Sequence, residues 1–108
     1  MTKSEPTVSQ LKKRSAFLCR TMGAIRESDD MFYFLRDLLT PDEMLEFSQR
    51  LDIAHKLSKG ESYTQIQKEV DTSSTTIARV SKFLQGQYGG YKKALARLAR
   101  KSKQQVSF

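Results

Sequence analysis

Residues 62–86 read SYTQIQKEVDTSSTTIARVSKFLQG, and they are the most informative segment for the fold. Ser62 and Gln65 have the spacing of a capping box, which predicts the start of a short helix. The pair Asp71-Thr72 predicts a turn, because neither residue favours a helix interior. A second helix is expected directly after that turn. Two short helices joined by a tight turn form the helix-turn-helix layout of proteins that read DNA.

The second helix, expected over residues 73–86, has an apolar face and a polar face. Ser73, or the residue before it, is expected to cap this helix. Ile77, Val80 and Leu84 recur at spacings of three and four residues, so they are expected to face inward. Short hydroxyl groups and basic side chains remain outside, where they suit phosphate oxygens and base edges. The residues predicted to contact DNA are Thr64, Gln65, Lys68, Ser73, Ser74, Thr75, Ala78, Arg79 and Lys82.

The same pattern has a second interpretation. Pairs of amphipathic helices occur in many helical proteins, and hydroxyl residues at a helix start are ordinary caps. Two classes of function therefore stay open. The first is a protein that binds double-stranded DNA in a sequence-specific way and regulates transcription. The alternative is a helical protein-interaction or architectural nucleic-acid-binding module without operator specificity.

Charge is unevenly distributed along the 108 residues, whose net charge is +7. Residues 2–26 carry six bases and one acid, residues 27–61 carry four bases and nine acids, and residues 91–103 carry six bases and no acid. Basic ends around an acidic middle suit a nucleic-acid partner, and they also occur on ordinary solvated surfaces. The basic residues expected to contact phosphates at any sequence are Lys92, Lys93 and Lys101.

The rest of the chain is also helical in pattern, so the predicted fold class is all-α. Thr40, Pro41 and Glu43 make the clearest helix start, with a cap, a proline at the first helical position and a capping-box glutamate. Gly60 is expected to end that helix. Outside the helix-turn-helix, helices are predicted over residues 8–26, 31–39, 41–59 and 91–101.

We expect one small domain, residues 9–101, between a disordered N-terminus (1–8) and a disordered tail (102–108). A chain of this length buries only roughly two thirds of its unfolded surface, so a second subunit is a plausible source of stability. The helix over residues 31–39 is apolar on most sides and therefore needs burial on most sides. Packing in a homodimer and a position in the centre of a monomer core both satisfy that need.

No catalytic site, metal site or cofactor is expected. His55 is the only histidine and Cys19 the only cysteine, so a zinc site built from such ligands cannot form. No glycine-rich phosphate loop is present, and we expect no enzyme activity. A single cysteine, an N-terminus without a secretory pattern and the absence of a bilayer-length apolar run predict a cytoplasmic protein with no membrane partner.

Several short motifs occur in a fixed order between Asp30 and Arg100. They are LTPDE at residues 39–43, QRL at 49–51, KGE at 59–61 and TTIARVS at 75–81. In these motifs the chain resembles the Trp repressor superfamily. GGYK at residues 89–92, followed by Leu95 and by Arg97-Leu98, is most similar to its YerC/YecD-type subgroup. The resemblance implies an intertwined, all-helical homodimer with two helix-turn-helix heads, acting as a transcriptional regulator and most simply as a repressor.

The resemblance also implies a corepressor pocket. Thr40, Arg50, Thr76 and Arg79 match positions that line the tryptophan site of the repressor. Val80 and Phe83 replace a glycine and a serine there, and both add bulk where an indole would sit. We therefore expect L-tryptophan not to bind, and the sequence names no other effector. The residues of this remnant effector pocket are Thr40, Arg50, Thr76, Val80 and Phe83.

Overall fold

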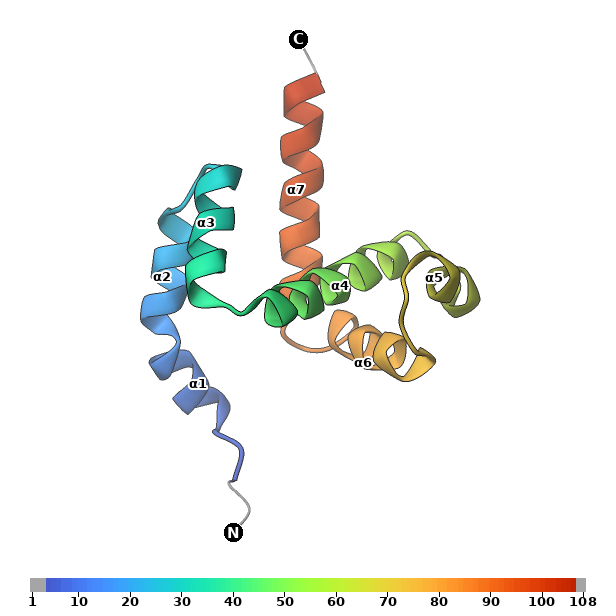
Figure 1. The fold of residues 1–108 in the computed structure, drawn as a ribbon, viewed down its shortest axis with the longest axis horizontal. Coiled ribbons are helices and arrows are strands. Elements are labelled where there is room, and N and C mark those ends of the chain that lie inside the picture. Colours follow the sequence, from blue (N-terminus) through green and yellow to red (C-terminus); the bar gives the residue numbers. More distant parts are fainter. Residues whose placement is uncertain (1–3, 107–108) are drawn as a thin grey trace. The chain divides into compact units, whose positions relative to one another are not determined.

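The computed structural model describes residues 4–106, and side chains as far as residue 102. Over that range the chain forms helices and no strand, which confirms the all-α fold class. It divides into two compact units, Met1–Pro41 and Asp42–Phe108. The first unit holds α1 to α3 and the second is built on α4 to α7 (Figure 1). The helices are α1 (Val8–Arg14), α2 (Ala16–Ala24), α3 (Ser28–Leu38), α4 (Pro41–Ser58), α5 (Tyr63–Glu69), α6 (Ser74–Leu84) and α7 (Gly90–Val106).

The helix expected over residues 8–26 is divided in the structure. Its start carries a full capping box, in which Thr7 Oγ1 accepts from the Gln10 N–H at 3.1 Å and Gln10 Oε1 accepts from the Thr7 N–H at 2.8 Å. At Ser15 the backbone leaves helical geometry (φ −93°, ψ 2°), and α2 begins one residue later. Serine is disfavoured in a helix interior, so the break falls at a residue that tolerates it. The expected disordered N-terminus thus gives way to a capped helix from Val8, and residues 1–3 lie outside the described residues.

The helix expected from residue 31 begins three residues earlier. Glu27 is its N-cap, and Asp29 and Asp30 lie in the first turn of α3. Carboxylates in a first turn interact favourably with the helix dipole, so the acidic residues extend the helix toward the N-terminus. No residue of α1, α2 or α3 is buried. The apolar helix expected to need burial is therefore uncovered within its own unit.

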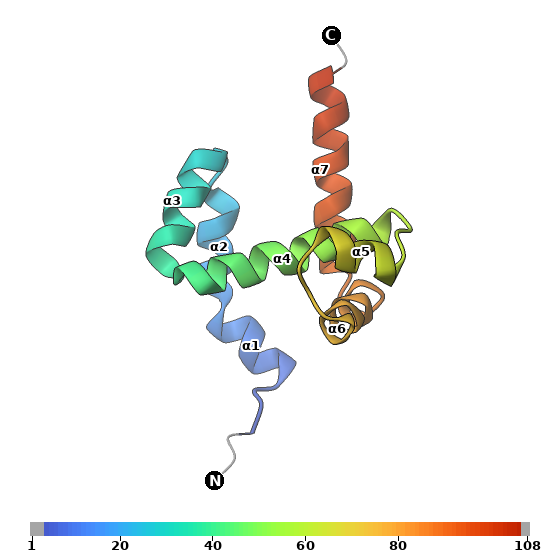
Figure 2. The same ribbon diagram turned by 45° about the vertical axis from the view of Figure 1, so that its right-hand side comes forward.

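The second unit has a small, closed core. Ile53 and Ala54 of α4 meet Ile66 of α5 and Ile77 and Val80 of α6. Three partly buried side chains pack against this cluster, namely Leu57, Val70 and Tyr91. Figure 1 and Figure 2 both show α6 on one side of α4, while the C-terminal half of α7 projects on the other side. The scaffold helix α4 therefore separates the helix-turn-helix from the free end of α7.

The buried face of α4 is narrow. Ile53 and Ala54 are fully buried, but Phe47 and Leu51 are each 46 % exposed and Leu45 is 70 % exposed. The core side chains of α5 and α6 and the partly buried Tyr91 of α7 pack around Ile53 and Ala54. Phe47 and Leu51 lie beside this buried strip, and Leu45 points in another direction.

The sequence predicted the end of α6 more closely than the end of α7. α6 ends at Leu84, and a left-handed Gly89 (φ 67°) lies directly before α7. The last helix was expected to end at residue 101, but α7 continues to Val106. Lysine and glutamine are good helix formers, and no glycine or proline interrupts the segment. The tail expected over residues 102–108 is thus helical as far as 106, and residues 107–108 lie outside the described residues.

Candidate nucleic-acid interface

The two faces of α6 are separated as the sequence predicted. Ile77, Val80 and Leu84 are buried, so the helix is fixed by its apolar side. The N-cap is Ser73, whose Oγ accepts from the Thr76 N–H at 3.2 Å and lies 3.1 Å from Thr76 Oγ1. The opposite face is exposed and carries Ser74, Thr75, Ala78, Arg79 and Lys82. The exposed face therefore has two cations and short hydroxyl groups.

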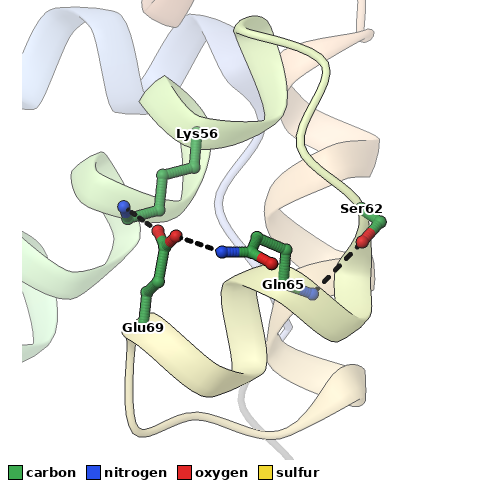
Figure 3. Close-up of polar contacts among 4 residues, drawn as sticks. All are labelled: Lys56, Ser62, Gln65 and Glu69. Carbon is green, nitrogen blue, oxygen red and sulfur yellow. Dashed lines mark hydrogen bonds and ion pairs between the residues drawn. The ribbon is translucent and has the colours of Figure 1, made fainter.

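The three residues predicted to contact DNA from α5 are also exposed. Ser62 caps this helix, with its Oγ accepting from the Gln65 N–H at 3.2 Å. The other half of the predicted capping box does not form. The Gln65 side-chain amide donates to Glu69 Oε1 at 2.6 Å, and an ionised carboxylate is a strong acceptor for it (Figure 3). Gln65 thus has one polar contact inside its own helix.

An ion pair joins the scaffold helix to the end of α5. The Lys56 ammonium contacts Oε2 of Glu69, and the two side chains are 28 % and 34 % exposed (Figure 3). Hydrogen bonds from Lys56 and Gln65 lower the pKa of Glu69 from 4.5 to about 2. The bond to Glu69 also raises the pKa of Lys56 above its ordinary 10.5, against the effect of desolvation. Both shifts favour the charged pair.

A second polar contact joins α4 to the turn of the helix-turn-helix. The Gln49 side-chain amide donates to the backbone carbonyl of Asp71 at 3.0 Å. Asp71 follows Val70, the C-cap of α5, and precedes the cap of α6 by two residues. The turn between the two helices is therefore bonded to the scaffold helix.

Positive charge continues from α6 into α7. The sequence contains no acid after Asp71, and it carries eight lysines and arginines in that part. α6 and α7 pack against each other, so Lys92 and Lys93 in the first turn of α7 belong to the base of that helix. Lys101 lies in the C-terminal half of α7; Figure 2 shows that this half projects on the other side of α4 from α6. The cations of α7 thus run from the base of the helix, next to α6, into its projecting half, and these two groups can be tested separately.

A cleft of about 490 Å³ opens between α4, α6 and α7. It brings together four of the five predicted pocket residues and adds Arg79, which the sequence had placed both in the DNA-contacting set and among the tryptophan-site matches. Thr40 belongs to the other compact unit. The lining residues are Glu46, Gln49, Arg50, Thr76, Arg79, Val80, Phe83 and Tyr91.

The two bulky substitutions do not close this cleft. Val80 is 4 % exposed because its side chain belongs to the core. Phe83 is 60 % exposed and lies at the edge of the space that it was expected to fill. The Arg50 guanidinium lies 5.4 Å from the ring centroid of Phe47, one turn earlier on α4. The cleft therefore remains open, with Val80 and Phe83 as part of its lining.

Sequence reasoning missed three residues of the cleft. Glu46 and Gln49 lie on α4 next to the arginine that was predicted, so the helical spacing of three and four residues contained the signal. Tyr91 comes from α7, and no local pattern links it to α4 or α6. Glu46 adds a carboxylate to a lining that otherwise has two guanidinium groups.

Comparison with known proteins agrees with this architecture. The family model described as Trp repressor protein matches residues 13–99. The chain belongs to the Trp repressor family. The uncharacterized protein YerC of Bacillus subtilis is 31 % identical over 81 residues, which cover 75 % of this chain and 78 % of YerC. This relative confirms the resemblance to the YerC-type subgroup.

A solved structure shows the same fold. The TrpR-like protein of Eubacterium eligens is 28 % identical, with a TM-score of 0.75 over 81 % of this chain and 90 % of that chain. The Trp repressor family is a family of regulators that bind DNA and typically dimerise, and it is not a family of enzymes. Among residues 4–106, no helix has both the length and the apolar character needed to cross a bilayer.

Proposed function

We propose that this member of the Trp repressor family is a homodimeric, sequence-specific regulator of transcription that reads the major groove of DNA with α6. The observation that carries the proposal is the division of α6 into a buried apolar face and an exposed face. The exposed face carries Arg79 and Lys82, and no acid follows Asp71 in the sequence. An arginine on such a face can pair with guanine or hold a phosphate.

The proposed contacts comprise residues of both helices. Ser74, Thr75, Ala78, Arg79 and Lys82 are on the exposed face of α6, and Thr64 and Lys68 are exposed on α5. Gln65 and Ser73 already take part in hydrogen bonds within the protein. A glutamine amide has a second hydrogen and a carbonyl oxygen, and a serine hydroxyl has a second lone pair, so both retain capacity for DNA. The lysines at the base of α7 add a phosphate contact.

The dimer is the second part of the proposal. The three helices of the first unit have no buried residue, while Phe17 and Tyr33 are 75 % and 67 % exposed. Apolar side chains in such numbers are normally covered by protein. We propose that residues 9–101 form one domain, and that the same domain of a second chain covers these side chains in a homodimer. Sedimentation analysis in the micromolar range should show a dimer, and a monomer would contradict this part.

The charges that line the cleft bear on whether tryptophan binds. Its lining has the Glu46 carboxylate next to Arg50 and Arg79, so an amino-acid carboxylate meets a like charge as well as its partners. We propose that L-tryptophan does not bind there. Isothermal titration should give no stoichiometric heat with L-tryptophan, and a saturable signal at one site per chain would overturn this part.

The experiment that tests DNA binding is recovery of fragmented genomic DNA by the purified protein, followed by sequencing, at moderate salt and without an added effector. Enrichment of a few sites with a shared two-fold symmetric motif supports the proposal. Binding should weaken steeply with salt, because each neutralised phosphate releases counterions. Uniform recovery of all fragments would favour the architectural alternative, and no recovery would favour a protein-interaction module.

Arg79→Ala tests the assignment of α6. Removing one base or phosphate interaction should cost about 1–3 kcal/mol of DNA-binding free energy. The unfolding midpoint should be unchanged, because Arg79 is exposed. The Gln87→Ala variant, in the loop after α6, is a control that should leave affinity unchanged. A loss of stability equal to the loss of affinity would make Arg79 structural.

A further inference from the structure

Two side chains of α4 hold the place where the chain leaves α5. Gln49 donates to the carbonyl of Asp71 at 3.0 Å, and Lys56 pairs with Glu69. Gln49 and Lys56 are seven residues apart, which places them on the same face of the helix, two turns from each other. The two groups that they hold are themselves only two residues apart in the chain. The scaffold helix therefore fixes one short segment at two points.

This segment controls where α6 begins. Asp71 is followed by Thr72 and by Ser73, the N-cap of α6. With only one residue between the bonded carbonyl and the cap, a displacement of Asp71 is transmitted to the start of α6. Ser74, Thr75, Ala78 and Arg79, which we propose to meet DNA, lie in the first two turns of that helix. The direction of approach of these residues thus depends on residues 69–71.

The apolar packing of α5 is confined to one face. This helix has seven residues and a single fully buried side chain, Ile66, whereas α6 has three. The partly buried Val70 at its C-cap packs against the same core, so the apolar contacts hold one face of α5 but leave rotation about that face to be restrained by other contacts. The Lys56–Glu69 pair and the Gln49–Asp71 bond lie at the end of α5, away from its capped start, so they oppose such a rotation.

We propose that Gln49 and Lys56 are positioning residues, which act through Asp71 and Glu69 as a two-point clamp that sets α5 and the start of α6 for DNA recognition. This inference rests on the proposed function, but the clamp can be measured without DNA. Gln65 is part of it, since its amide donates to Glu69 Oε1 at 2.6 Å and leaves Oε2 for Lys56 (Figure 3). The carboxylate is thereby held on both oxygens.

The low pKa of Glu69 agrees with this arrangement. The hydrogen bonds from Lys56 and Gln65 lower the pKa to about 2, so the carboxylate is charged at every pH at which the protein would meet DNA. An ion pair that is about one third exposed contributes modestly to stability. The role that we assign is therefore orientation, and its test must separate orientation from stability and from simple charge.

The sign of one substitution separates orientation from charge. If Lys56 acts only as a positive charge near DNA, Lys56→Gln weakens binding and Glu69→Gln strengthens it, because the latter removes a negative charge. If the pair acts as a clamp, both variants weaken binding to the preferred site. The charge-swapped double variant Lys56→Glu/Glu69→Lys keeps the net charge and should restore most of the affinity.

The DNA measurement compares two duplexes of equal length at one salt concentration: the genomic fragment most enriched by the wild-type protein, and a scrambled version of it. Lys56→Gln and Glu69→Gln should each lower the ratio of the two affinities by about two- to fivefold. Gln49→Met, which keeps the side-chain length and removes the donor, should lower it by about two- to tenfold. Lys59→Gln, which removes the same charge three residues further along, and Gln87→Ala should leave the ratio unchanged.

The second measurement is amide hydrogen exchange of the free protein. Each clamp variant should speed exchange of the Val70 N–H by about the same factor as it lowers the affinity ratio. This amide reports on the clamp because it donates to the Ile66 carbonyl in the last turn of α5. Exchange in the middle of α4 should not change. An affinity ratio that stays constant, a rise in affinity for Glu69→Gln, or unchanged exchange at Val70 would each overturn the clamp. A wild-type protein that prefers no fragment would refute the proposed function, and exchange alone would then decide the clamp.

Discussion

The two compact units of this chain are both helical, but only one has a core. In the second unit the buried side chains of α4, α5 and α6 enclose one another, with Ile53, Ile66 and Ile77 fully buried. In the first unit no described residue is buried, and Phe17 is 75 % exposed. Local caps and spacing suffice to form helices, whereas stability comes from covering their apolar faces. The comparison indicates that the helix-turn-helix has its own scaffold and core, whereas α1 to α3 leave their apolar side chains largely exposed within their unit.

The largest effect is expected from the core of the second unit. Ile77→Ala removes a fully buried side chain and should lower the free energy of unfolding by about 2–5 kcal/mol. Phe17→Ala removes a larger but mostly exposed side chain. In dilute solution, where dimers dissociate, it should change stability by less than about 0.5 kcal/mol. Denaturant titration measures both, and equal losses of stability would remove the difference between the units.

The next effect concerns assembly. Phe32 is 49 % exposed on α3 and forms an edge-to-face pair with Tyr33, with ring centroids 5.3 Å apart. If a second chain covers this surface, Phe32→Ser should raise the dimer dissociation constant by about tenfold or more. Tyr63→Ser, at a similarly exposed aromatic on α5, is the matched control. Sedimentation equilibrium gives both constants, and an equal response would place the interface elsewhere.

A smaller effect should distinguish the two groups of cations on α7. The double variant Lys92→Gln/Lys93→Gln removes charge at the base of the helix, next to α6. It should reduce the slope of log affinity against log salt by about one for each phosphate that is no longer neutralised. Arg100→Gln/Lys101→Gln, in the projecting half, removes the same charge and should reduce the slope less. Equal reductions would show that DNA contacts the whole of α7.

The smallest effect is the pH dependence of the Lys56–Glu69 pair. The folded protein lowers the pKa of Glu69 from 4.5 to about 2, so the pair stabilises the fold above pH 4.5 and loses that contribution as pH falls toward 2. The charged and polar groups near this carboxylate are Lys56, Gln65 and Glu61. Glu69→Gln should therefore have a lower unfolding midpoint than the wild type at pH 6, and the difference should vanish near pH 2. A difference that is constant over this range would contradict the assignment.

Local features of this fold were accessible from the sequence because they depend on neighbouring residues. Ser62 and Ser73 cap the helices that they were predicted to cap, and Pro41 starts α4. The inner face of α6 follows from the spacing of Ile77, Val80 and Leu84. Ser15 was missed because the apolar spacing continues across the break. The end of α7 was missed because basic composition suggested a tail where helix propensity is high.

The candidate site was only partly accessible for the same reason. Arg50, Thr76, Val80 and Phe83 meet at one cleft, as the family resemblance implied, but the open space depends on where each side chain points. The Val80 side chain is buried in the core, whereas the Phe83 side chain is mostly exposed. The size of the two residues does not reveal these directions. Tyr91 of α7 could not be predicted as a lining residue, because no local sequence pattern links it to α4 or α6.

The presence of the helices, the caps at Ser62 and Ser73 and the two faces of α6 could be predicted from the chain alone, because each rests on residues within about four positions of one another. Which apolar faces are covered and which polar groups meet was settled by tertiary packing. Lys56 and Glu69 are 13 residues apart, and Gln49 and Asp71 are 22 apart. Their contacts require that α5 fold back along α4, and that path is set by burial of Ile66 against Ile53 and Ala54 rather than by any pattern around the polar residues themselves.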